Sequence, residues 1–473
     1  MKKYAWFGVL VTLLLGYSCA FQGEKSKRPK YVFFFIGDGM GNSQVTGTQF
    51  YLAEQKGRIG LDSLSFTGFP VVNMMSTYSA FNAITCSAAA GTALATGVRT
   101  SNGTIGKDAI HSKDVYSIAV KAKEMGLSVG ITTSVSVDHA TPAVFYAHQP
   151  SRSMYYDIAM DAVKADFDLY AGSGFLQRRS YINPSFPEVY ASFQEAGYVI
   201  ARGYRDFENK RKDASRIVWV QEEGKDSVSL SYAIDRQEGD LTLSEITRGA
   251  IDYLLSKSNR GFFLMVEGGK IDWACHSNDG ATVFREVTDF AEAVDVALRF
   301  YRQYPDETLI VVTADHETGG MGLGTQGYDL NLKLLQYQQH SLDVISRRMV
   351  RLRESKAGKV TWEEMKLLLR GELGFWDKIE IMKEEEETLK QEFEMSYLRG
   401  GMAVQGLYAA LEPLAQQAVT LLNNKAQVGW TTPEHTGTRV PLYVIGAGAW
   451  RFGGSVLNNT DVPRIITEAV GWN

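Results

Sequence analysis

The segment YVFFFIGDGMG, residues Tyr31–Gly41, decides the fold class of this chain. It begins with an unbroken apolar run and stops at Gly-Asp-Gly, with no alternation of apolar and polar residues. Such a run is typical of a strand that is covered on both faces, as in a parallel sheet. The segment therefore predicts a buried parallel strand with an acid, Asp38, at its carboxyl end.

The same pattern recurs along the chain and extends the prediction to a whole sheet. GFFLMVEGGKID (Gly261–Asp272) and TLIVVTADHETGG (Thr308–Gly320) are close copies of it, and Leu127–Ala143 and Val440–Ala449 are weaker ones. Between two of these runs, Ala281–Tyr304 has the apolar spacing of an amphipathic helix. Alternating strands and helices predict an α/β fold, a three-layer sandwich with a central, mainly parallel sheet flanked by helices.

The domain organisation follows from a change in character near residue 328. A chain of 473 residues could hold about three domains, although large α/β enzymes can form a single one. Residues 328–427 are highly charged and helical in pattern. We expect them to be a helical insertion that covers or flanks the site, between core segments at residues 21–327 and 428–473.

The N-terminal residues 1–20, MKKYAWFGVLVTLLLGYSCA, have the layout of a bacterial-type secretory signal peptide. Two cleavage sites are compatible with it, one after Ala20 and one before Cys19, which would then carry a lipid anchor. Either one sends the chain across the inner membrane, to the periplasm or to an association with the outer membrane. Beyond Cys19 the only cysteines are Cys86 and Cys275, and two packed thiols are favoured over a bridge between them.

The composition and net charge of the chain indicate what kind of molecule it acts on. The chain is 45% hydrophobic and 22% charged, which is ordinary for a soluble protein with a large core. A net charge of −5 and a pI near 5.9 provide no basic footprint for nucleic acid. Small-molecule chemistry is therefore expected.

Acids and histidines gather where the predicted strands end. Asp38, Glu267 and Asp315 each close a buried strand, and ligand sites of open α/β sheets lie beyond those carboxyl ends. Any one of these acids could be a turn or cap residue, but three at equivalent positions favour a site. Two histidines and one more acid join them: Asp272 lies four residues before His276, and His316 follows Asp315. Imidazole and carboxylate groups without paired thiolates suit a catalytic zinc site.

Six ordered motifs carry a family resemblance: GDGMG, SAAAGTALATG, DHATP, VEGGKIDWACH, TADHETGG and HTG. In this order and context they resemble the alkaline phosphatases, metal-dependent phosphomonoesterases. The resemblance spans Tyr31 to Ala449, with the helical insertion and the extreme ends outside it. It implies hydrolysis of phosphate monoesters to inorganic phosphate and an alcohol through a covalent phosphoserine, and relatives are often homodimers.

The resemblance also implies site residues. Ser87 matches the phosphorylated nucleophile, and Arg152 matches the arginine that binds the substrate phosphate. Three metal sites are implied, two for Zn²⁺ and a third usually for Mg²⁺. The ligands that match are Asp272, His276 and His435 for the first, Asp38, Asp315 and His316 for the second, and Asp38, Thr141 and Glu267 for the third.

Three positions depart from the best-known bacterial pattern. His139 stands near the third metal site in place of an aspartate, and Trp273 replaces a lysine that contacts phosphate indirectly. Both are expected to contact substrate, to make the third site less selective for Mg²⁺, open to Zn²⁺ instead, and to loosen phosphate binding. Cys86 stands where an arginine-orienting aspartate is common, which leaves open what holds Arg152.

Other activities are weighed against this one. A sulfatase would need a Cys-x-Pro-x-Arg signature, and Cys86 is followed by Ser-Ala-Ala-Ala. A phosphodiesterase or phosphonate hydrolase stays open, because the insertion could reshape the substrate pocket. A phosphate- or metal-binding protein without turnover would leave an intact nucleophile unexplained.

Overall fold

The computed structural model describes residues 28–398, 404–405, 407–408 and 410–472. The expected signal peptide, with Cys19, lies outside these described residues, so the cleavage site and the lipid anchor stay predictions. Within the described part of the chain, no helix has the length and apolar character needed to cross a bilayer.

A ten-stranded sheet forms the centre of the molecule, in the order β16-β2-β15-β8-β1-β7-β3-β4-β6-β5. The seven strands from β8 to β5 are parallel to one another, and β15 runs antiparallel to both of its neighbours. The α/β prediction with a mainly parallel sheet is confirmed. The strands are β1 (Tyr31–Gly37), β2 (Val71–Ser76), β3 (Ser128–Thr133), β4 (Leu169–Ala171), β5 (Tyr198–Arg202), β6 (Arg216–Val220), β7 (Phe262–Gly268), β8 (Thr308–Thr313), β15 (Val440–Gly446) and β16 (Leu457–Asn458).

Strand β1 lies near the middle of the sheet because its side chains are apolar on both faces. Val32 through Ile36 are fully buried. On one side β1 pairs with β7, with Ile36 opposite Glu267, and on the other it pairs with β8, with Ile36 opposite Thr313. This register brings the carboxyl ends of the three strands to the same edge of the sheet.

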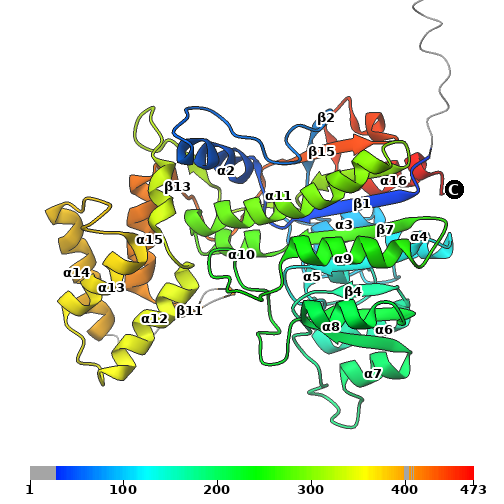
Figure 1. Ribbon diagram of the computed structural model, residues 1–473, viewed down its shortest axis with the longest axis horizontal. Helices are drawn as coiled ribbons and strands as arrows, with labels where there is room; N and C mark the ends of the chain where they lie inside the picture. The colour runs from blue at the N-terminus through cyan, green and yellow to red at the C-terminus, as the bar shows by residue number, and fades with distance from the viewer. Residues whose placement is uncertain (1–27, 399–403, 406, 409, 473) are drawn as a thin grey trace, which may run out of the picture.

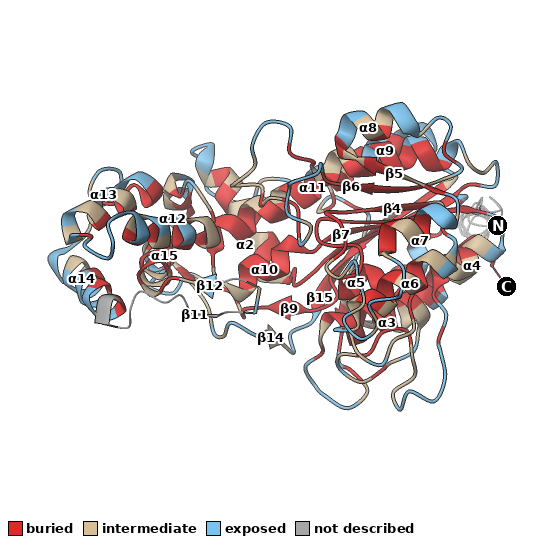
Figure 2. Ribbon diagram, turned by 90° about the horizontal axis from the view of Figure 1, so that it is seen from below, coloured by how far each residue is buried: buried red, intermediate tan, exposed pale blue. Residues whose placement is uncertain are grey.

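Helices cover both faces of the sheet (Figure 1). Helices α8, α9 and α11 lie on one face, and α3, α5 and α6 lie on the other, as the view from below confirms (Figure 2). Most of the helix surfaces turned toward the sheet are buried. The helices of this part are α2 (Asn42–Gln55), α3 (Ser87–Thr96), α4 (Ile118–Glu124), α5 (Ala140–Ala143), α6 (Tyr155–Ala165), α7 (Val189–Glu195), α8 (Gly203–Lys210), α9 (Leu243–Leu255), α10 (Lys270–His276), α11 (Gly280–Gln303), η2 (Ala449–Phe452) and α16 (Asp461–Val470).

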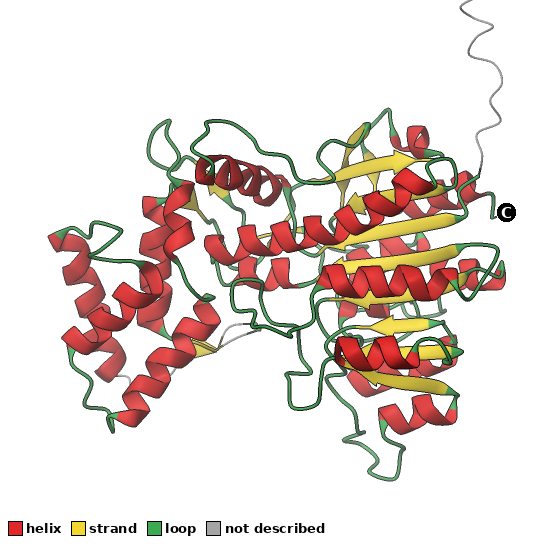
Figure 3. Cartoon of the chain, in the orientation of Figure 1, coloured by secondary structure: helices red, strands yellow, loops and turns green. Residues whose placement is uncertain are grey.

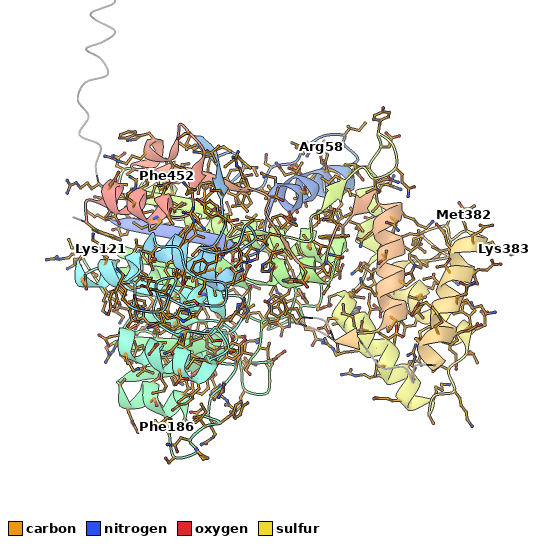
Figure 4. The ribbon with its side chains drawn as sticks, turned by 180° about the vertical axis from the view of Figure 1, so that it is seen from behind. Arg58, Lys121, Phe186, Met382, Lys383 and Phe452 are labelled. Carbon is orange, nitrogen blue, oxygen red and sulfur yellow. The ribbon has the colours of Figure 1, made fainter. Side chains whose placement is uncertain are left out.

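A second group of helices, here called the helical lobe, stands beside the sandwich (Figure 3). Seen from behind, Met382 and Lys383 lie on its outer side, away from the sheet (Figure 4). The lobe and its connections comprise η1 (Leu332–Tyr337), α12 (Leu342–Ser355), α13 (Trp362–Leu373), α14 (Lys383–Leu398), β11 (Val404–Gln405), β12 (Ala410–Leu411) and α15 (Pro413–Lys425). Four further short strands complete the assignment, β9 (Glu317–Thr318) with β14 (His435–Thr436), and β10 (Gly322–Leu323) with β13 (Val428–Gly429).

Polar contacts fix the lobe to the turn between α10 and α11. The buried Asp279 accepts hydrogen bonds from the Gln338 side chain and from the Leu342 backbone. Asn423 on α15 donates to the Asn278 carbonyl oxygen. Because these buried polar groups are hydrogen-bonded to one another, they hold the lobe directly next to the helix that carries Asp272 and His276.

The close approach of β1 and β7 depends on a glycine. Gly261 has φ +114°, and a Cβ atom there would lie 2.0 Å from the carbonyl oxygen of Lys30. We expect Gly261→Ala to destabilise the protein by about 2–4 kcal/mol, from backbone strain and overpacking together. Gly224 is the matched control, since it has φ +88° and open space around it. Thermal denaturation should show the lower Tm for Gly261→Ala, and equal Tm values for the two variants would contradict the steric argument.

Candidate metal and phosphate site

The site lies where β1, β7 and β8 end. Asp38 follows β1, Glu267 is the next-to-last residue of β7, and Asp315 comes two residues after β8. All three side chains are fully buried. Helix α10 begins directly after β7, so it places Asp272 and His276 on one face of a helix at the same edge.

The first group of ligand atoms consists of Asp272, His276 and His435. The Nε2 atoms of the two histidines face each other at 3.1 Å, and His276 Nε2 lies 3.2 Å from Asp272 Oδ2. Each imidazole binds a backbone carbonyl through Nδ1, His276 that of Pro433 at 2.5 Å and His435 that of Thr85 at 2.9 Å. Nδ1 is then the protonated nitrogen, which leaves both Nε2 lone pairs free for a metal.

The second group consists of Asp38, Asp315 and His316. His316 Nε2 lies 3.4 Å from Asp38 Oδ1 and 3.4 Å from Asp315 Oδ2. These two carboxylate oxygens are buried and have no hydrogen-bond partner among the described residues. Buried oxygens without a donor are costly, and a cation between them would satisfy both.

The third group shares Asp38 with the second. Its other members are Glu267 and His139, and Thr141 donates to Asp38 Oδ2 at 3.3 Å. One oxygen of Glu267 is held by Thr133, and the other has no partner among the described residues. His139 is therefore close enough to act as a ligand here, in addition to the predicted threonine.

Burial, together with mutual repulsion, makes these carboxylates hard to ionise. Burial, with the neighbouring acids, raises the pKa of Asp38 well above its usual range, that of Glu267 to about 8 and that of Asp315 to about 7. Burial also opposes ionisation of Asp272, but the imidazoles of His276 and His435 outweigh it and lower its pKa. A cluster that resists ionisation in this way is stabilised by bound cations.

Ser87 begins helix α3 and reaches into this cluster. Its hydroxyl lies 3.2 Å from His316 Nε2, and the side chain is fully buried. Apart from Leu94, this helix consists of small residues, which lets α3 pack closely on α5 beside it. The positive end of the helix dipole therefore points at the position where negative charge would gather.

Arg152 is held through its backbone and its side chain. Its N–H donates to the Gly103 carbonyl oxygen at 2.7 Å, and the Gly103 N–H in turn donates to Cys86 Sγ at 3.1 Å. Nη2 of Arg152 lies 3.2 Å from His139 Nε2. Burial and the charge of Arg152 lower the pKa of His139 to about 3, so the imidazole is a neutral acceptor.

Comparison with known proteins decides the family. The family model for alkaline phosphatase matches residues 29–170 and 225–472. The chain belongs to the alkaline phosphatase family. It is 31% identical to alkaline phosphatase 4 of Bacillus subtilis (strain 168) over 446 residues, covering 92% of this chain and 87% of the relative. For alkaline phosphatase 3 of the same organism the identity is 31% over 454 residues, with coverages of 94% and 89%.

Solved structures agree with the fold of this alkaline phosphatase. The cold-active enzyme from a psychrophilic Shewanella species matches with a TM-score of 0.76 and 28% identity, over 93% of this chain and 99% of that one. The Thermus thermophilus enzyme matches with a TM-score of 0.77 and 25% identity, over 96% and 94%. The predicted family and enzyme class, a phosphomonoesterase hydrolase, are confirmed. Metal-binding groups are present as well, and phosphate monoesters are the substrates that the family implies.

The extent of the resemblance needs a correction. The family match runs through residues 328–427, which we expected to lie outside it, and it omits residues 171–224 instead. Charge and helical pattern distinguish the lobe from the sandwich, but they do not show whether the other members of a family share that segment. The domain limits themselves stay predictions.

Sequence reasoning missed two residues of this alkaline phosphatase's site. Thr318 donates to Asp272 Oδ1 at 2.5 Å and lies 3.2 Å from His316 Nδ1, so one hydroxyl links the first two groups. Only the tertiary structure reveals the position of Thr318, because the β9–β14 ladder pairs it with His435, which is distant in sequence. The other missed residue is Tyr408, whose ring stacks on Trp273 with centroids 4.4 Å apart. Burial raises the pKa of its hydroxyl.

Thr318 predicts a measurable effect on metal binding. Thr318→Val keeps the shape of the side chain but removes the hydroxyl that orients Asp272 and His316. Because such outer contacts tune ligand geometry, the affinity for a divalent metal ion should fall about 10–100-fold. Thr318→Ser, which keeps the hydroxyl, is the control and should bind nearly as tightly as the wild type. Competition with a chromophoric chelator measures both, and full affinity in Thr318→Val would disprove the link.

Proposed function

We propose that this alkaline phosphatase hydrolyses phosphate monoesters through a covalent phosphoserine at Ser87. The observation that carries the proposal is the position of the Ser87 hydroxyl, 3.2 Å from His316 Nε2 and at the start of α3. A serine hydroxyl is a weak nucleophile at neutral pH and needs an activating neighbour. The second group of ligand atoms provides a place for one directly beside it.

The proposed cofactors are two Zn²⁺ and one Mg²⁺, and their fit rests on the donor atoms. The first two groups offer nitrogen and carboxylate oxygen, with no thiolate among the described ligand groups, as catalytic zinc prefers. Asp38, Glu267 and Thr141 offer oxygen only, as Mg²⁺ prefers, whereas a nitrogen from His139 would favour Zn²⁺ at the third site. When bound, such ions supply Lewis-acid stabilisation of negative oxygen during phosphoryl transfer.

The protein's own residues bind and orient the phosphate. The Arg152 guanidinium can donate two parallel hydrogen bonds to nonbridging oxygens, a geometry that a lysine cannot reproduce. The Ser87 oxygen attacks phosphorus, the P–O bond to the alcohol breaks, and the alcohol leaves. Water then attacks the phosphoserine, the Ser87 O–P bond breaks, and inorganic phosphate leaves. Two in-line displacements retain configuration at phosphorus.

His139 and Trp273 are proposed to form the side of the pocket around the phosphate. His139 contacts Arg152, and the two aromatic rings of His139 and Trp273 lie 5.9 Å apart. The indole N–H of Trp273 is buried without a partner among the described residues. It is therefore available as a neutral donor where a lysine would bring a positive charge.

The place of action is also a proposal. The N-terminal sequence at residues 1–20 supports export across the inner membrane, to the periplasm or to the outer membrane through a lipid on Cys19. Assembly as a homodimer is proposed because relatives often form one. Mass spectrometry of the mature N-terminus tests the first point, and sedimentation of the purified protein tests the second.

The nucleophile is tested by substitution. Ser87→Ala should lower kcat for p-nitrophenyl phosphate by about 10³-fold or more while the bound metal stays the same. Cys86→Ala is the matched control from the neighbouring position, and it should stay active. Turnover assays with elemental analysis of each variant distinguish these outcomes, and a fully active Ser87→Ala would overturn the proposal.

A substrate panel separates the competing activities. The wild type should prefer p-nitrophenyl phosphate to bis(p-nitrophenyl) phosphate and to p-nitrophenyl sulfate. Preference for the diester would indicate a phosphodiesterase, and preference for the sulfate would indicate a sulfatase.

The substituted pair His139 and Trp273 predicts the strength of product inhibition. A double variant with His139→Asp and Trp273→Lys restores a positive charge near the phosphate and an oxygen ligand near the third group. Inorganic phosphate should then inhibit the enzyme more strongly than it inhibits the wild type. Initial rates at increasing phosphate concentration measure the inhibition constant, and an unchanged constant would contradict the assigned role.

A further inference from the structure

The absence of an acid at position 86 leaves the side chain of Arg152 with an unusual set of partners. Cys86 is engaged with the Gly103 backbone. Nη2 of Arg152 contacts the neutral imidazole of His139. The Tyr408 hydroxyl also accepts a hydrogen bond from the guanidinium.

Tyr408 comes from the helical lobe, where it lies between β11 and β12. Its ring packs flat on Trp273, with centroids 4.4 Å apart and an angle of 8° between the planes. It also meets His276 edge-on at 5.4 Å and lies 6.0 Å from the His139 ring. Three aromatic side chains of the site therefore fix the orientation of the phenol.

The segment that carries Tyr408 is anchored close by. Four residues later, the buried Glu412 pairs with Arg353 at 2.6 Å and its N–H donates to Ser346 Oγ at 3.1 Å. Glu412 also caps helix α15, whose Gln416 donates to the carbonyl oxygen of Ser277, next to His276. These bonds tie the base of the segment both to the lobe and to the end of α10.

We propose that Tyr408 is a positioning residue for Arg152, in which the helical lobe supplies the orienting contact that Cys86 cannot. The Trp273 ring holds the phenol flat, and the hydroxyl holds the guanidinium toward the phosphate. An uncharged phenol orients the arginine without compensating its charge, so the full charge is left for the phosphate dianion. This inference rests on the proposed role of Arg152 in binding the substrate phosphate.

The test is a double-mutant cycle in the metal-loaded, full-length protein. Tyr408→Phe keeps the stack on Trp273 and removes only the hydroxyl, and Leu407→Ala is the matched control because Leu407 is an exposed neighbour. The dissociation constant for inorganic phosphate is measured by calorimetry, with KM and kcat for p-nitrophenyl phosphate. Metal content and Tm are measured for each variant.

Tyr408→Phe should weaken phosphate binding about three- to tenfold, which is the loss expected from one hydrogen bond. It should also raise KM more than it lowers kcat. In an Arg152→Ala background the same substitution should change nothing, because the group it positions is gone. Metal content, Tm and the Leu407→Ala variant should match the wild type.

Three results would overturn the inference: unchanged phosphate binding in Tyr408→Phe, an equal loss with and without Arg152, or a loss that follows metal content. Failure of the proposed function is a separate outcome. A wild type without phosphomonoesterase turnover would refute that function, while the calorimetric cycle would still report on the contact between Tyr408 and Arg152.

Discussion

The main physical constraint on this structure is that four mutually repelling carboxylates are buried together, away from water. Asp38, Glu267, Asp272 and Asp315 are all fully buried at one edge of the sheet. Burial and repulsion favour protonation of three of them, so the cluster is favourable only when positive charge is present. Three imidazoles stand in the same space, each with Nε2 turned inward. The buried carboxylates and the imidazole Nε2 atoms therefore form a site that favours bound cations.

A rigid scaffold is needed to hold such a cluster, and the parallel sheet provides it. Strands β1, β7 and β8 are apolar on both faces, so their register is fixed by packing on two sides. Each strand then delivers its acid at the same edge. Helix α10 follows β7 with almost no loop, which extends this precision to Asp272 and His276. Glu267, Asp272 and His276 lie within these regular elements and Asp38 directly follows one, whereas His435 lies on a two-residue ladder.

Much of this could be predicted from the sequence, for a physical reason. An apolar run without alternation identifies a strand covered on both faces, and a polar residue that ends it must lie at the sheet edge. Spacing of four residues also predicted the shared face of Asp272 and His276. Tyr408 could not be found in this way, because its partners are distant in sequence and nothing local marks it. Thr318 lies only two residues after His316, but nothing in its local sequence shows the contact with the distant Asp272. The antiparallel course of β15 was likewise invisible, since a buried strand has the same pattern in either direction.

The order of the strands determines where further strands can be added to this sheet. Strands β6 and β5 with helices α7 and α8 fall within residues 171–224, the part outside the family match, and they form one margin of the sheet. Hydrogen bonds run only between neighbouring strands, so material added beyond β4 leaves the pairing of β1, β7 and β8 untouched. Strands can therefore be added at that margin of the sheet while the edge that carries Asp38, Glu267 and Asp315 keeps its geometry.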